Sequence, residues 1–129
     1  MKVVIILFLL IFLAGCVNFI SFNSVRTGDL NEIEKALSRG ANINQTDYNG
    51  DSPLTVALSS LNDDNIVEVT QFLLKNNAST KTVNYNGDYP LSIIVKRNDL
   101  NDETQAELIK LLALYKANMN QENYWGLSP

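Results

Sequence analysis

The chain has 129 residues, of which 46% are hydrophobic and 19% are charged, and its formal net charge is -4. This composition is typical of one compact domain, and the acidic balance disfavours nucleic-acid binding because phosphates would be repelled. The sequence contains no histidine and one cysteine, which excludes internal disulfides, histidine-based acid–base chemistry and the usual zinc sites. We therefore expect a protein that is not an enzyme and that has no metal, no cofactor and no small-molecule substrate.

The first sixteen residues, MKVVIILFLLIFLAGC, have the layout of a secretory signal, with one cation, a short apolar core and small residues at its end. The last four of these residues resemble the lipobox of bacterial lipoproteins, in which a peptidase cuts before the cysteine and the thiol receives a diacylglycerol. The resemblance implies a removable signal peptide over residues 1–15, cleavage between Gly15 and Cys16, and a lipid on Cys16.

Two alternatives remain for this N-terminal segment. In the first, the segment is retained as a membrane anchor, although its unbroken apolar part is short for a hydrocarbon core of about 30 Å. In the second, it is a plain cleaved signal followed by an ordinary buried cysteine. Removing residues 1–15 takes Lys2 away and leaves nine basic against fourteen acidic residues. Since anionic lipids would not attract such a chain, the lipid itself must supply membrane attachment. We expect a lipid-anchored protein of the cell envelope, and Val17 favours the outer membrane if the host has two.

Helical patterns follow in pairs along the rest of the chain. Residues 18–26 predict a short helix, and residues 28–40 a longer one that Gly40 ends. Residues 52–60 and 89–97 each predict a short helix with a proline in the first turn, and Ser52 is placed to cap the first of them. Residues 65–76 and 104–118 predict longer amphipathic helices. Polar links join the two helices of each later pair, and we expect them to be surface loops.

A repeated phrase marks the start of successive units. DYNGDSPL at residues 47–54 nearly recurs as NYNGDYPL at residues 84–91, and NYWGLSP at residues 123–129 resembles both. The glycines Gly50, Gly87 and Gly126 are separated by 37 and 39 residues, and periods in this range are typical of solenoids. Asn-rich segments before each glycine indicate extended links with a hairpin turn. The pattern predicts an all-α repeat solenoid.

The pattern resembles the ankyrin repeat. The second unit supplies Gly50, the segment Ser52-Pro53-Leu54-Thr55, Ala57, Val69, Phe72, Leu73, Leu74 and the closing Asn77-Ala78. The resemblance implies a stack of antiparallel helix pairs joined by extended β-hairpin-like fingers over residues 16–129. Its repeats would cover about 18–46, 47–83 and 84–122, with the start of a fourth at 123–129. Thr55 and Ser92 replace the signature histidine, and the second and third units are longer than the usual 33 residues.

In ankyrin proteins the concave surface usually binds other proteins, and the resemblance implies that an unidentified protein is the partner here. The positions that would face it are Tyr48, Asn49, Asp51, Ser59, Ser60, Tyr85, Asn86, Asp88, Lys96, Arg97, Tyr124 and Trp125. An alternative is that the tyrosines only pack on neighbouring fingers and that the Asn-Gly pairs serve the turns. We interpret the Asn-Gly pairs as structural and leave both roles open for the tyrosines.

The sequence supports two hypotheses about function. The first is an interaction module that docks a protein at the envelope, including a protective or immunity-type protein that masks another envelope component. The second is a targeting arm of a longer enzyme or toxin whose catalytic part follows Pro129. Because the last phrase stops where a helix should begin, we expect the face formed by Leu108, Leu111 and Leu112 to lack a covering repeat. We also expect the chain to be the beginning of a longer protein or a truncated copy of one.

Overall fold

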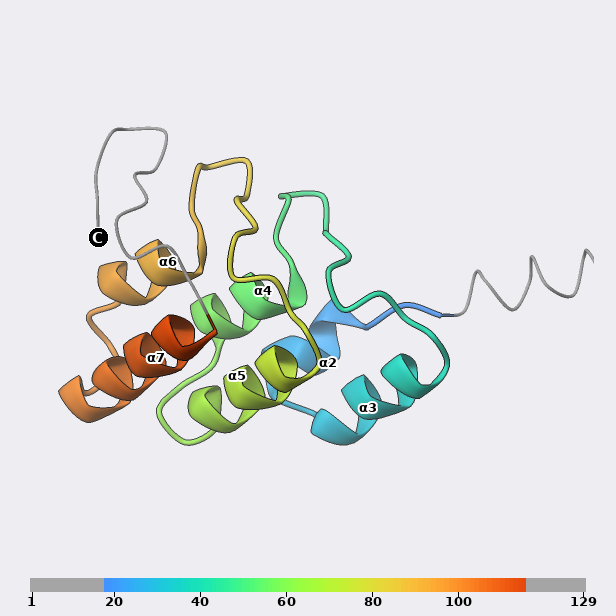
Figure 1. The fold of residues 1–129 in the computed structure, drawn as a ribbon, viewed down its shortest axis with the longest axis horizontal. Helices are drawn as coiled ribbons and strands as arrows, with labels where there is room; N and C mark the ends of the chain where they lie inside the picture. Colours follow the sequence, from blue (N-terminus) through green and yellow to red (C-terminus); the bar gives the residue numbers. More distant parts are fainter. Residues whose placement is uncertain (1–17, 116–129) are drawn as a thin grey trace, which may run out of the picture.

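The computed structural model describes residues 18–115, and within that range the fold is all-α, with six helices and no strand. The helices lie in two rows (Figure 1). The first row holds α2 (Phe22–Thr27), α4 (Pro53–Ser60) and α6 (Pro90–Lys96), and the second holds α3 (Leu30–Ser38), α5 (Ile66–Lys75) and α7 (Asp102–Leu114). The predicted signal peptide, Gly15, Cys16, Tyr124 and Trp125 lie outside the described residues.

Helices α4 and α6 each begin at a proline, where the missing N–H costs no hydrogen bond because the first N–H groups of a helix have no partner within the helix. Before α4, the hydroxyl of Ser52 accepts a hydrogen bond from the N–H of Thr55 at 3.3 Å, as the sequence predicts. Before α6, the hydroxyl of Ser92 instead accepts from the N–H of Tyr89 at 3.0 Å. The two helices therefore start at equivalent positions of the repeated phrase, with different side chains closing the first turn.

The long helix α7 begins earlier than its apolar pattern predicts. Asn101 caps it by accepting a hydrogen bond from the N–H of Thr104 at 2.8 Å. Asp102 and Glu103 occupy its first turn, where negative charge interacts favourably with the helix dipole. The predicted start at residue 104 missed these polar residues because they carry no hydrophobic signal.

The core lies between the two rows and is formed by aliphatic side chains of both. Consecutive helices pack as the pairs α2–α3, α4–α5 and α6–α7, while α4 contacts both α2 and α6, and α5 contacts α7. Completely buried residues include Ile33, Leu54, Leu58, Ile66, Leu73, Ile94, Leu108 and Leu112. The prediction that the face of Leu108, Leu111 and Leu112 lacks cover is therefore wrong for Leu108 and Leu112, which lie on the helix that packs against α5.

The links within the pairs α4–α5 and α6–α7 are mostly polar, but each contains one buried leucine. Leu61 in the first link is 3% exposed and Leu100 in the second is 7% exposed, and both belong to the core. The prediction of polar surface loops holds for their other residues, most of which are exposed. One buried leucine in each loop fixes its path between the two rows.

The links between the helix pairs project on one side of the molecule (Figure 1). The expected β-hairpin-like fingers are not seen, because residues 18–115 contain no strand. Near each tip a backbone hydrogen bond joins the two arms, from the N–H of Asp47 to the carbonyl of Asp51 and from the N–H of Asn84 to the carbonyl of Asp88, both at 2.9 Å, and a second closes the turn at Gly50 or Gly87. The side-chain Oδ1 atoms of Asp47 and Asn84 accept the N–H groups of Asp51 and Asp88. The two arms therefore form no ladder of backbone hydrogen bonds. Of the helices in this range, none has the length and apolarity needed to cross a bilayer.

Candidate functional site

The repeated phrase folds into the same turn twice. The Oδ1 atom of Asp47 accepts hydrogen bonds from the N–H groups of Asn49 at 2.8 Å and Asp51 at 3.0 Å. In the next copy, the Oδ1 atom of Asn84 accepts from Asn86 at 3.0 Å and Asp88 at 2.9 Å. Asp and Asn are equivalent as acceptors in this role. The first residue of the phrase therefore holds the turn, and the predicted structural role of this segment agrees with the geometry.

The two turns also contact each other directly. The N–H of Tyr85 donates to the carbonyl of Asn49 at 2.9 Å, and the Nδ2 of Asn84 donates to the Oδ1 of Asp51 at 2.9 Å. Gly50 has a φ of +77°, and a Cβ placed there would lie 3.0 Å from the Cδ1 of Tyr85. The ring of Tyr85 thus covers the preceding turn while the residue stays 77% exposed, which supports a packing role for this tyrosine.

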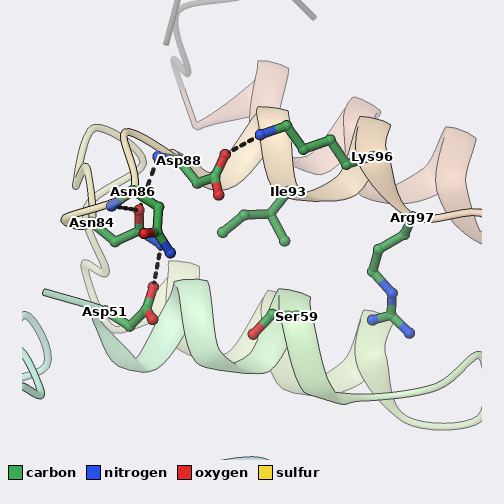
Figure 2. Close-up of a pocket in the computed structure, with 8 residues that line it drawn as sticks. All are labelled: Asp51, Ser59, Asn84, Asn86, Asp88, Ile93, Lys96 and Arg97. Atoms are coloured by element: carbon green, nitrogen blue, oxygen red, sulfur yellow. Dashed lines mark hydrogen bonds and ion pairs between the residues drawn. The ribbon is translucent and has the colours of Figure 1, made fainter. Parts of the chain in front are cut away.

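A groove of about 340 Å³ lies between α4, α6 and the second turn. It is lined by Asp51, Ser59, Asn84, Asn86, Asp88, Ile93, Lys96 and Arg97. Figure 2 shows the turn residues at one end, Arg97 at the other, and Ile93 between the two helices. Six of these eight residues are among the predicted partner-facing positions, so the structure brings residues from two successive units into one surface.

Of the two carboxylates that line the groove, one forms an ion pair and the other does not. The ammonium of Lys96 forms an ion pair with the carboxylate of Asp88, and both side chains remain partly exposed. Asp51 accepts one hydrogen bond from the neutral amide of Asn84, and no cationic group among residues 18–115 lies within ion-pair distance of its carboxylate. Asp51 is therefore the carboxylate of the groove whose charge is not balanced by a neighbour.

Arg97 closes the groove and connects α6 to the end of α4. Its Nη1 donates to the carbonyls of Leu58 at 2.8 Å and Leu61 at 2.6 Å, and its Nε donates to Asp99 at 2.9 Å. The hydrogen bonding of the Arg97 side chain to the Asp99 carboxylate lowers the pKa of Asp99 below its usual value. Because the Arg97 side chain is only 12% exposed and most of its donors are used, it forms a wall of the groove rather than an open contact point.

The remaining predicted residues lie around the groove. Tyr48, Asn49, Ser60 and Tyr85 are exposed but do not line it. Sequence reasoning missed two lining residues, Asn84 and Ile93. Their signals were available, since Asn84 occupies the first position of the repeated phrase and Ile93 lies three residues before Lys96, on the same face of a helix.

No protein-family model matches this chain, and a search of curated proteins finds none that is similar to it. Between residues 18 and 115, no three potential metal-ligating side chains of His, Cys, Asp or Glu gather at one point. The groove combines a small apolar floor with hydroxyl, amide and charged groups. Such a surface is suited to holding a polypeptide segment in a fixed orientation.

Proposed function

We propose that this chain is an ankyrin-repeat lipoprotein that binds a partner protein at the cell envelope, with the groove between α4 and α6 as its docking surface. The lipid on Cys16 would hold the chain at the membrane while its helical part stays in water. The observation that carries the proposal is the groove itself, which joins six predicted partner-facing residues from two successive units.

The arrangement of helices supports the ankyrin assignment. Short helices occupy one row and long helices the other, and the links that join successive pairs project on one side (Figure 1). Equivalent positions of the repeated phrase have equivalent hydrogen bonds, as the turns at Asp47 and Asn84 illustrate. Repeat stacks of this kind offer an extended surface whose residues come from several units.

The composition of the groove supports a protein partner. Ile93, which is 8% exposed, supplies an apolar floor, and the polar side chains around it can orient a bound backbone or side chain. Tyr48 and Tyr85 are large aromatic residues with 85% and 77% exposure, and tyrosine often contributes strongly to interface energy. They stand at the turns that border the groove and extend the contact surface beyond it.

A matched pair of variants tests this function. Ser59 is exposed and lines the groove, whereas Gln71 is an exposed residue of α5 that does not. The full chain would be recovered from detergent-solubilised membranes as wild type, Ser59→Tyr and Gln71→Tyr, and the proteins bound to each would be identified. We expect a specific protein to be retained by the wild type and by Gln71→Tyr and lost with Ser59→Tyr. Equal recovery with all three chains would contradict docking in the groove.

A further inference from the structure

We propose that the groove recognises a basic side chain, lysine or arginine, of its partner, and that Asp51 is the carboxylate that binds it. This inference rests on the proposed function and specifies the chemistry of the partner. It comes from comparing two successive units of the chain. Both have an aspartate after the glycine of the repeated phrase, but only the later unit has a lysine eight residues further on.

The third unit shows how a carboxylate of this surface is neutralised. Asp88 ends the repeated turn, and Lys96 lies eight residues later on α6, where its ammonium pairs with the Asp88 carboxylate. Figure 2 shows the Lys96 side chain extending along the groove toward Asp88. A long cationic side chain at this offset therefore reaches the carboxylate from the same helix.

The second unit has the same carboxylate without the cation. Asp51 occupies the position equivalent to Asp88, and Ser59 occupies the position equivalent to Lys96. Helices α4 and α6 both begin two residues after the aspartate, at Pro53 and Pro90, so the two offsets correspond. Ser59 is too short to reach the carboxylate, and its hydroxyl donates instead to the carbonyl of Val56 at 3.1 Å.

The other charges of the groove do not replace the missing lysine. Lys96 is bound to Asp88, and Arg97 is bound to Asp99 and two backbone carbonyls. The charge on Asp51 is thus complementary to an external cation, and the exposed surface around Ser59 gives access to it. The apolar part of a lysine or arginine side chain can lie along Ile93 while its charged end reaches Asp51.

A simple probe tests this recognition directly. The full lipidated chain in neutral detergent micelles would be titrated with a blocked Gly-Arg-Gly peptide and with its citrulline analogue, which has nearly the same shape but no charge. NMR shifts of the Gly50 and Asp51 amides would report binding. Because a partly exposed ion pair contributes up to about 1 kcal/mol, we expect the arginine peptide to bind about fivefold more tightly than the citrulline peptide.

Two variants and two controls assign the effect to Asp51. Asp51→Asn removes the charge but can still accept the hydrogen bond from Asn84, and Ser59→Lys supplies an internal cation in the position of Lys96. Each should weaken arginine-peptide binding about fivefold, while the exposed controls Asp64→Asn and Gln71→Lys should leave it unchanged. The inference is overturned if the wild type binds neither peptide, if both peptides bind equally, or if both groove variants bind like the wild type. The proposed function fails on a different result, equal protein recovery by wild type and Ser59→Tyr.

Discussion

Replacing Gly50 by alanine tests the contact between the two turns. The left-handed backbone at this position, with a φ of +77°, costs an alanine about 1–2 kcal/mol. The new Cβ would also lie 3.0 Å from the Cδ1 of Tyr85 and 3.2 Å from its backbone nitrogen, and overpacking of this kind adds about 1–3 kcal/mol. We expect Gly50→Ala to lower the free energy of unfolding by roughly 2–5 kcal/mol.

Gly40 provides the matched control for this substitution. Its φ is +90°, and a Cβ placed there meets no atom within 4 Å. Gly40→Ala should therefore cost only the backbone strain of about 1–2 kcal/mol. Urea unfolding of the full chain, followed by circular dichroism, measures both differences.

A double variant separates strain from contact. In a Tyr85→Ala background, the ring that meets the Gly50 Cβ is absent, and the cost of Gly50→Ala should approach that of Gly40→Ala. Only the contact with the Tyr85 backbone nitrogen would persist. The reasoning is refuted if Gly50→Ala and Gly40→Ala cost the same, or if removing the ring recovers none of the difference.

Four further predictions follow from individual side chains. Arg97→Ala should destabilise the chain by about 1–3 kcal/mol in urea unfolding, because it leaves two carbonyls without their donor; an unchanged midpoint would contradict this. Leu108→Ala, at a fully buried position, should cost about 2–5 kcal/mol, whereas Leu114→Ala, at a residue 73% exposed, should change the same measurement little. The lowered pKa of Asp99 means that its contribution to stability is present above its unfolded pKa and lost as pH falls through its folded pKa, so Asp99→Asn should flatten the acid side of a stability–pH profile. Cys16→Ser should abolish acyl labelling in cells, and a variant that is still fully labelled would exclude lipidation at this residue.

The helices of this fold could be predicted from the sequence because their signals are local. Proline at the first position, a polar cap and apolar spacing predicted α4 and α5 to within one residue at each end. The start of α7 was missed because its first turn is purely polar. Burial of Leu108 and Leu112 was also missed, since the spacing of leucines defines a face but does not say which neighbouring helix covers it.

The groove was predictable only in part for a related reason. The repeated phrase identified Asp51 and Asp88 as equivalent surface positions and Asn86 as a neighbouring one, and the three do meet at one surface. What the sequence alone did not reveal is how the charges pair, because Arg97 bonds to a loop 36 residues earlier in the chain. Such long-range bonds decide which charged side chains are free to meet a partner, and they depend on the packing of whole helices.

Photo-crosslinking in living cells tests the central claim, that the groove docks a protein, most directly. A photoreactive residue would be placed at Asn86, an exposed position that lines the groove, and in a second strain at Gln71, an exposed position on α5. The account predicts a discrete adduct with one protein from position 86 and none from position 71. No adduct from position 86, or the same adduct from both positions, would contradict it.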